Sequence, residues 1–503
     1  MCVPDVSVFF LMHLVSQLIE PCVSNICIIQ STRRPLLAAI STLSFLTLLG
    51  KMDIFFLNLL QICKLSAPVQ RKVLPFMHKS NLADKAQSGP VQRALYQKTV
   101  LENGIRIVSE TIPYVRSVSV GIWANVGSRD ESGTENGISH FLEHMVFKGT
   151  KTRSVREIAQ SLESLGGYLN AFTTKEQTCF YARVLDEHVE QAVDVLSDLI
   201  QHATFKREEM EKEKLVVIEE LKNAEDDPED IIHDYFEKAL FPTHPLGFPI
   251  IGTEANLRTF TRNDLQLHVA EHYTASRMVV AAAGNIDHED LVRLVRRHLT
   301  RVPPMGEPVT RAQASGRSVK GIAEEYSRQI QQSHVCIGTV GYSIRHKDRY
   351  PLMVMNALLG EGMSSRLYQS IREKFGLAYS VYSFVNMLSD TGSFGAYIGT
   401  DKNNVVNATE LVHKEFEKLR RKPVPKAELD RTKSQIKGTM MLGLENMSGR
   451  MMRLGTSELY FNAFTSLDTI LKKVDAVTPD AIHRVANDVL REERLSTVVI
   501  RPS

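Results

Sequence analysis

The chain has 503 residues, of which 43% are hydrophobic and 23% are charged, and its formal net charge is +2. This length allows more than one buried core, and the near-neutral charge excludes a general electrostatic attraction to nucleic acid or to an anionic membrane. The six cysteines form no C-x-x-C pair and no disulfide framework, which is typical of a protein from a reducing compartment. Length and composition therefore favour a soluble enzyme that binds no nucleic acid.

The N-terminal extension, residues 1–95, differs in composition from the rest of the chain. An arginine pair precedes an apolar run over residues 36–50, which is shorter than the ~20 residues of a membrane-spanning helix, so we expect no stable membrane span. Three interpretations stay open: a start codon placed too early, with Met52 or Met77 as the true beginning; an export or anchor segment over residues 33–64; or an organellar targeting peptide. The first predicts a cytoplasmic protein, and the second an exported or membrane-anchored one.

A histidine pair carries the strongest functional signal in the chain. An alternating strand is predicted over residues 118–126, and a turn-rich segment separates it from the pentad His140-Phe-Leu-Glu143-His144. Residues i and i+4 of a helix share a face, so both imidazoles can reach one metal ion, with Glu143 in reach of water on that ion. Because the neighbouring residues are apolar, the segment is predicted to be buried, where histidines and a carboxylate need partners. We predict a metal site, with a purely structural polar cluster as the alternative.

A second helix supplies a candidate third ligand. Periodicity predicts, after the pentad, a helix, a strand and another helix, over residues 155–165, 178–184 and 187–202. A charged helix follows over residues 209–223, in which Glu213 and Glu220 stand seven residues apart, two turns, and therefore share a face. A hydrolytic zinc site needs three protein ligands and one open position, and a glutamate here would complete it. An ordinary charged surface helix is the alternative.

Together these two segments resemble the inverzincin metallopeptidases, which include pitrilysin, insulin-degrading enzyme and the mitochondrial processing peptidase. That family has H-x-x-E-H followed about 75 residues later by a glutamate ligand, and here 76 positions separate His144 from Glu220. The resemblance implies that His140, His144 and Glu220 bind one zinc ion per chain. It also implies that Glu143 is the general base and that Glu213 supports the site.

The resemblance extends from about residue 98 to the C-terminus and is greatest to short bacterial relatives of the processing peptidase β subunit. Residues 167–184 resemble the family's substrate-binding edge strand. This similarity implies that Asn170 and Ala171 pair with the peptide backbone.

The body of the chain repeats itself. Four segments of its first half have counterparts in the same order in the second half: 118–126 and 335–344, 205–214 and 424–433, 257–265 and 474–482, 278–286 and 495–502. We predict an α+β fold of two homologous α/β sandwich domains that enclose a cleft or chamber. The first domain is assigned to residues 96–301, a linker rich in proline and glycine to 302–317, and the second domain to 318–503.

The second copy lacks the metal ligands. Aligned on the repeat, threonines stand opposite Glu213 and Glu220, and residues 352–359, opposite the metal helix, contain no histidine or carboxylate. If the candidate ligands were needed only for folding, both copies would need them. Because only the first copy has these ligands, they are more consistent with a chemical role.

The second copy has a motif of its own. Residues 370–383 resemble the family's R-x6-Y motif, which implies that Arg372 and Tyr379 reach the substrate carbonyl from the opposite domain. An arginine and a tyrosine hydroxyl can stabilise a developing oxyanion. Without the resemblance, this stretch is an amphipathic helix that runs into a strand.

These observations predict a zinc endopeptidase that acts on short or unfolded peptides. Peptides are the expected partners, and the family's short members imply a homodimer. The alternative, from another class, is a non-catalytic peptide-binding or structural subunit of a hetero-oligomer. A zinc-binding regulator without turnover is a third interpretation.

Overall fold

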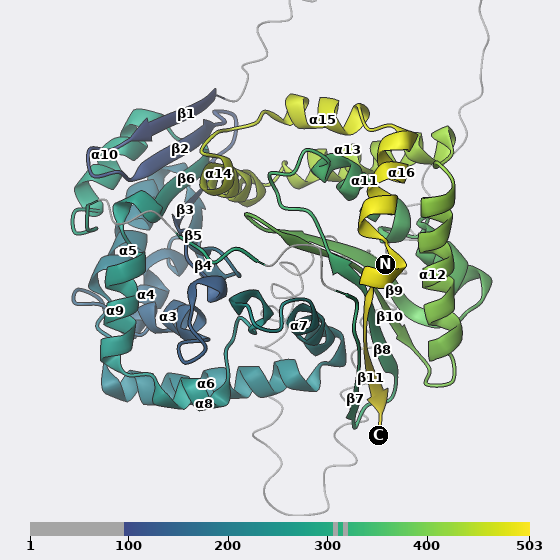
Figure 1. Ribbon diagram of the computed structural model, residues 1–503. Helices are drawn as coiled ribbons and strands as arrows, with labels where there is room; N and C mark the ends of the chain where they lie inside the picture. The colour runs from purple at the N-terminus through teal and green to yellow at the C-terminus, as the bar shows by residue number, and fades with distance from the viewer. Residues whose placement is uncertain (1–94, 305–309, 315–319) are drawn as a thin grey trace, which may run out of the picture. The chain divides into compact units, whose positions relative to one another are not determined.

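A computed structural model describes residues 95–304, 310–314 and 320–503, all within the unit Arg93–Ser503 (Figure 1). The three interpretations of the N-terminal extension concern residues outside this range. No helix among the described residues is long and apolar enough to cross a bilayer.

The first half of the unit is built on a six-stranded sheet with strand order β1-β2-β6-β3-β5-β4 (Figure 1). All neighbours are antiparallel except β2 and β6. The central strands β3 and β6 are buried on both faces, because helices cover the sheet from both sides. The strands are β1 (Leu95–Val100), β2 (Arg106–Thr111), β3 (Ser117–Ala124), β4 (Tyr168–Thr173), β5 (Thr178–Leu185) and β6 (Met278–Gly284).

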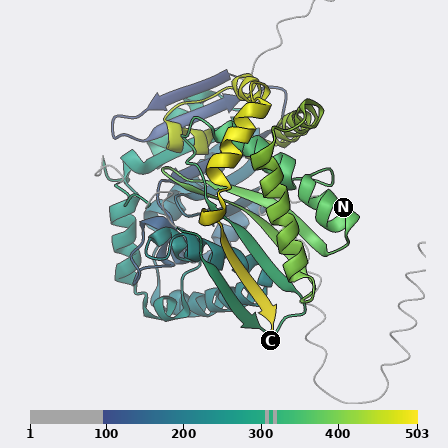
Figure 2. The same ribbon diagram turned by 45° about the vertical axis from the view of Figure 1, so that its right-hand side comes forward.

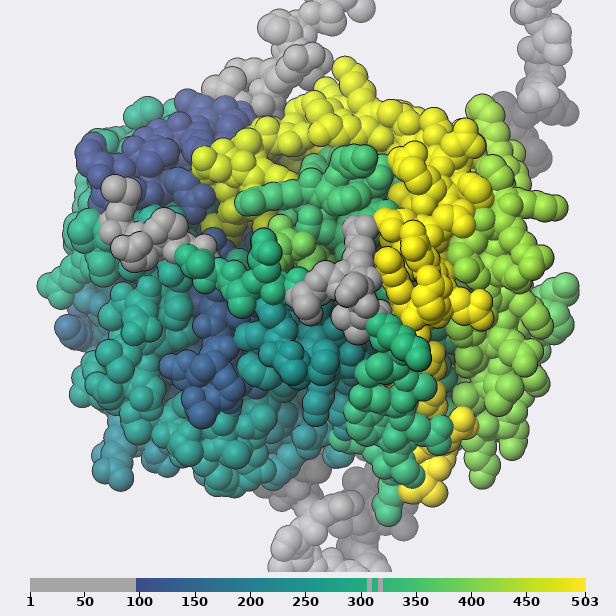
Figure 3. Space-filling model, in the orientation of Figure 1, coloured from purple at the N-terminus to yellow at the C-terminus, as the bar shows by residue number. Residues whose placement is uncertain are grey.

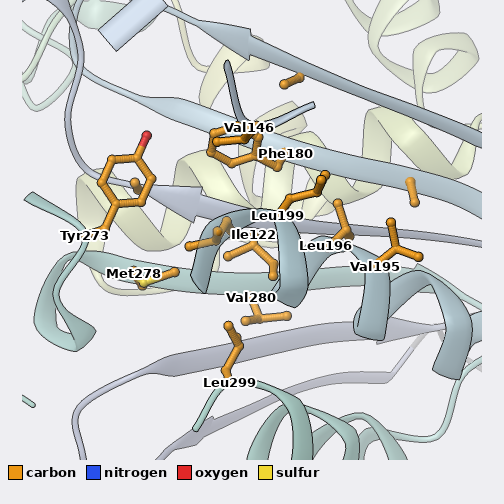
Figure 4. Packing of buried hydrophobic residues seen from close by; sticks show 14 of the residues in the cluster. Ile122, Val146, Phe180, Val195, Leu196, Leu199, Tyr273, Met278, Val280 and Leu299 are labelled. Atoms are coloured by element: carbon orange, nitrogen blue, oxygen red, sulfur yellow. The ribbon is translucent and has the colours of Figure 1, made fainter. Parts of the chain in front are cut away.

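One face of this sheet holds the main core of the first half. Ile122 of β3 is the cross-strand neighbour of Phe180 in β5 and of Val280 in β6, and all three lie with Leu196 and Leu199 in one buried cluster (Figure 4). The helices of this half are α3 (Ile138–Val146), α4 (Val155–Glu163), α5 (Val189–His202), α6 (Arg207–Asp226), α7 (Pro228–Leu240), α8 (Glu254–Thr259), α9 (Arg262–His272) and α10 (His288–His298).

The second sheet repeats the first. Its order, β7-β11-β8-β10-β9, matches β2-β6-β3-β5-β4 strand for strand, and β7 and β11 are its one parallel pair. In the turned view the yellow β11 ends the chain beside β7 (Figure 2). The α+β fold and the internal duplication are therefore confirmed. The strands are β7 (Ala323–Arg328), β8 (Ser333–Val340), β9 (Ala378–Met387), β10 (Gly392–Thr400) and β11 (Ser496–Pro502).

The helices of the second half follow the same order. The helix α11 stands in the place of α3, α12 in that of α5, and α13 in that of α6; β1 and α10 have no counterpart among the described residues. The predicted linker, 302–317, falls between the last element of the first half and β7. The helices are α11 (Arg349–Gly360), α12 (Val405–Arg421), α13 (Lys426–Gly443), α14 (Met447–Phe461), α15 (Leu467–Asp475) and α16 (Pro479–Val489).

The two halves exchange helices. The helix α7, which follows α6, packs on β8 and β11 of the second sheet, and its counterpart α14 packs on β3 and β6 of the first. Equivalent glycines permit both approaches, because a Cβ on Gly121 would lie 2.7 Å from Met451 Sδ and one on Gly338 would lie 2.9 Å from Phe236 Cζ. Each half therefore completes the core of the other.

Further contacts join the halves at the end of α14. The space-filling view shows the purple strands of the first half beside the yellow segment that follows α14 (Figure 3). There Tyr96 stacks on Phe464 with 4.3 Å between ring centroids. Elsewhere the buried Arg129 of the first half bonds Glu176 at 2.7 Å and Asp390 of the second half at 2.6 and 2.8 Å.

Candidate metal centre

The helix that carries the histidine pair is held at its N-terminus by a buried carboxylate. Glu131 accepts hydrogen bonds from the backbone N–H groups of Gly137 and Ser139, each at 2.8 Å. These N–H groups have no partner inside the helix, and a negative charge at this end interacts favourably with the helix dipole. Gly137 itself has a φ of 99°, a conformation that glycine adopts without steric cost. The turn before α3 is thereby fixed.

Three side chains from two helices come together at the face of α3. His140 and His144 project from α3 and Glu220 from α6, and one ligand atom of each lies within 4.8 Å of the other two. Glu220 Oε2 is 3.3 Å from His144 Nε2, and Glu220 Oε1 is 3.8 Å from His140 Nε2. Two imidazoles and one carboxylate at this spacing are the donor set of a catalytic zinc site that keeps a fourth position open. The residues present fit zinc.

Glu213 contacts one of these histidines. Its Oε1 lies 2.9 Å from His144 Nδ1, and its Oε2 lies 2.6 Å from the ammonium of Lys148. Burial lowers the pKa of His144, but its hydrogen bonds to Glu213 and Glu220 outweigh that effect and raise the pKa to about 9. With Nδ1 donating to Glu213, Nε2 is the nitrogen directed at the metal position. The predicted supporting glutamate therefore contacts His144 directly.

Glu143 lies on the same helix, beside the edge strand β4. Thr173 Oγ1 donates a hydrogen bond to Glu143 Oε2 at 2.6 Å. Burial raises the pKa of Glu143 to about 7, and the bond from Thr173 opposes this rise. A carboxylate whose pKa lies near the working pH can both accept and return a proton.

The predicted substrate strand is an edge strand. β4 pairs with β5 and ends the sheet, and the described residues provide no strand on its other side. Asn170 donates to the hydroxyl of Tyr168 at 2.7 Å, and its Oδ1 accepts from the backbone N–H of Ala171 at 2.8 Å. The side chain of Ala171 is buried, so this residue can meet a peptide only through its backbone.

The structure also brings Arg372 and Tyr379 together. The Arg372 guanidinium lies 4.7 Å from the centroid of the Tyr379 ring and donates to the Tyr379 carbonyl at 2.7 Å. The helical turn that carries the arginine is a π-helix, Tyr368–Lys374, where the sequence predicts an ordinary amphipathic helix. Such turns are frequent at functional sites. The Tyr379 side chain is 75% exposed, so it does not serve as a core aromatic.

Two family models match the chain one after the other, and the second match begins before β6, the last strand of the first sheet. Residues 106–254 match the family described as Insulinase (Peptidase family M16), and residues 259–436 match its Peptidase M16 inactive domain. An uncharacterized zinc protease of Bacillus subtilis is 40% identical over 412 residues, which cover 81% of this chain and 99% of the relative. The chain belongs to peptidase family M16.

Another relative and two solved structures are also similar to this chain. An uncharacterized zinc protease of Streptomyces coelicolor is 40% identical over 80% of this chain and 89% of its own length. A protease from Helicobacter pylori has the same fold, with a TM-score of 0.77 and 23% identity over 82% of this chain and all of that one. A peptidase M16 inactive domain from Pseudomonas fluorescens has a TM-score of 0.76 and 19% identity, over 81% of this chain and 98% of that one.

The two copies of the M16 scaffold share a structural contact but not the ligands. Lys214 of α6 donates to the Arg258 carbonyl at 3.3 Å, and the aligned Lys433 of α13 donates to the Asp475 carbonyl at 2.7 Å. Thr432, aligned with Glu213, instead bonds back to its own helix at 3.1 Å. The scaffold lysine is therefore present twice and the glutamate only once.

Sequence reasoning missed three residues of this M16 site: Glu131, Lys148 and Thr173. Lys148 follows His144 by four positions, so helical spacing could have placed both on one face. Glu131 and Thr173 reach their partners only through the folding of a loop and a strand. No periodicity signals such contacts.

Proposed function

We propose that this chain is a zinc-dependent endopeptidase that hydrolyses peptide bonds in short or unfolded peptides, with one zinc ion per chain. The observation that carries the proposal is the convergence of His140, His144 and Glu220 beside Glu143, in one copy of a duplicated scaffold. Names of relatives support the class, because several are called zinc proteases. A reducing, cytoplasmic location and a homodimer belong to the same proposal.

Each residue of the site then has a role. His140, His144 and Glu220 would hold the zinc ion, which when bound would supply a Lewis acid for the attacking water and the scissile carbonyl. Thr173 holds Glu143 Oε2, so Oε1 takes the proton from water and later passes it to the leaving amine. Glu213, neutralised by Lys148, keeps the proton of His144 on Nδ1.

Substrate recognition in this proposal uses backbone atoms. An extended peptide adds to the free edge of β4 near Asn170 and Ala171, a mode that tolerates varied side chains. Short or unfolded peptides can take up this extended form, which is why the proposal names them as substrates. Arg372 and Tyr379 donate to the carbonyl oxygen as it becomes negative, and the exposed position of Tyr379 leaves its hydroxyl accessible.

Substitutions at three glutamates test the proposal. Glu143→Gln keeps the shape of the side chain and the metal, and its peptide turnover falls by orders of magnitude because the base is lost. Glu220→Gln loses zinc measured by metal analysis. The matched control is Glu219→Gln, since Glu219 is the adjacent residue of α6 and pairs with Lys222 on the surface at 2.6 Å.

The results separate the proposal from its rivals. Cleavage by Glu143→Gln at the wild-type rate would refute the mechanism, and full zinc in Glu220→Gln would move the third ligand elsewhere. A zinc-loaded wild type that binds peptides without cleaving them would identify a non-catalytic peptide-binding subunit instead.

A further inference from the structure

The edge strand β4 presents two different faces. Leu169, Ala171 and Thr173 alternate along it, and the first two pack into the core on the side of α3. Phe172 lies on the other face, with the core cluster that α14 covers. This alternation directs the Thr173 hydroxyl at α3, where it donates to Glu143 Oε2 at 2.6 Å. Among the described residues, Thr173 is the one hydrogen-bond donor to this carboxylate.

We propose that Thr173 is a positioning residue for catalysis, which holds the Glu143 carboxylate from the same strand that pairs with the substrate. A glutamate side chain has three rotatable bonds, and one short bond to a fixed strand removes most of their freedom. The base then keeps one oxygen in a defined direction while peptide lies along the strand edge. This inference rests on the proposed function, because it requires Glu143 to act as the base.

The duplicated sheet offers a comparison within the chain. Thr173 pairs with Thr178, which pairs with Ala124 of β3. In the second sheet, Gly341 corresponds to Ala124 and Gly392 to Thr178, and the Gly341 N–H donates to the Gly392 carbonyl at 2.7 Å. Gly392 pairs in turn with Met387. The position of Thr173 is therefore occupied by a methionine in the copy that has no general base. A hydroxyl needed only for the sheet would be expected in both copies.

A structural role makes a different prediction from a positioning role. If the hydroxyl only satisfied a half-buried carboxylate, its loss would lower stability and leave turnover per folded molecule unchanged. If it positions the base, its loss lowers kcat while KM stays constant, because the strand edge that binds peptide is made of backbone. Zinc content is expected to stay unchanged in both cases, since the Thr173 hydroxyl bonds to Glu143, which is not one of the three proposed ligands.

The experiment uses the zinc-loaded full chain and a peptide that the wild type cleaves. Thr173→Val, nearly isosteric, is expected to lower kcat by about 10- to 100-fold, the effect of one lost bond to a charged group. The KM of this variant is expected to stay within about threefold of the wild type, because the peptide binds to backbone atoms of the strand edge. Thr173→Ser restores kcat, because it keeps the hydroxyl. The matched control is Thr178→Val. Thr178 is the cross-strand partner of Thr173, and its buried hydroxyl donates to the Val126 carbonyl at 3.0 Å. This variant is expected to have a lower melting temperature and an unchanged kcat.

A double substitution adds a second test, in which the effect of Thr173→Val is compared with and without the Glu143 carboxylate. Thr173→Val in the Glu143→Gln background is expected to cost nothing further in residual turnover, because Thr173 acts through Glu143. Peptide binding to this inactive pair, followed by fluorescence titration, stays at the level of Glu143→Gln. If Thr173→Val does not fold, Thr173→Ala replaces it and carries the same expectation.

Three results would overturn the inference. These are an unchanged kcat in Thr173→Val, an equal loss in Thr173→Ser, or a loss that lies wholly in KM or zinc content. Failure of the proposed function is distinguishable, because either the wild type would then cleave no peptide or Glu143→Gln would remain active. An inactive Glu143→Gln together with a fully active Thr173→Val refutes the role of Thr173 alone.

Discussion

Glu213→Gln tests how the metal site is held in place. The carboxylate is buried, and it joins His144 Nδ1 at 2.9 Å to Lys148 Nζ at 2.6 Å. The glutamine amide keeps the shape of the side chain but removes the negative charge that faces His144 and Lys148. A hydrogen bond to a charged group contributes about 1.5–3 kcal/mol, and residues that orient a metal ligand are worth about 10- to 100-fold in metal affinity. Both routes give a zinc dissociation constant raised by roughly 10- to 100-fold.

The assay is competition for zinc against a chelator of known affinity. Glu211→Gln is the matched control, because Glu211 pairs with Lys214 on the same helix at 3.0 Å but does not touch His144. Melting of the metal-free variants shows whether the substitution acts through the fold. A dissociation constant for Glu213→Gln within twofold of the wild type would refute the positioning role.

Three further predictions concern the second half, the exchange of helices and pH. Tyr379→Phe should lower kcat by about 10- to 1000-fold in steady-state peptide cleavage, with zinc content and melting temperature unchanged because the side chain is exposed; an unchanged kcat would remove the hydroxyl from the mechanism. Separately produced halves, 77–310 and 317–503, should each self-associate in gel filtration and be inactive, and should recover activity when co-expressed, because each sheet is covered by a helix of the other half; an active monomeric first half would contradict this. Burial, with His272 and Arg277 nearby, lowers the pKa of His268 to about 3, so the unfolded chain binds a proton below pH ~6.5 that the folded chain does not. Stability in urea should therefore fall by up to about 1.4 kcal/mol per pH unit below that point, and His268→Gln should lose less; equal losses in both proteins would show that His268 does not titrate on unfolding.

The sequence predicted those features that depend on spacing along one element or on the repeat. The i, i+4 histidines and the seven-residue spacing of Glu213 and Glu220 place these groups on common helix faces wherever the helices pack. Four ordered matches predicted the duplicated fold because they mark equivalent places in the order of elements: two pairs are strands, one pair begins a helix, and one pair spans the turn between two helices. The assignment of residues 302–317 as a linker stays a prediction.

Other features depend on tertiary geometry and leave no trace in one sequence. The helices α7 and α14 have an apolar face whichever sheet they cover, so their exchange between the halves could not be predicted. Strand order likewise requires the three-dimensional connections. The contact of Thr173 with Glu143 joins residues 30 positions apart through the packing of a strand on a helix, and neither residue type signals it.

The central claim, zinc-dependent cleavage of peptide bonds, is tested most directly by mass spectrometry of an unbiased peptide library. The purified chain, shown by metal analysis to hold one zinc ion, is incubated with the library before and after removal of zinc by a chelator. The account predicts products cut at internal bonds, loss of cleavage with the chelator, and its return when zinc is restored. A chain that holds one zinc ion and leaves every peptide intact would contradict it.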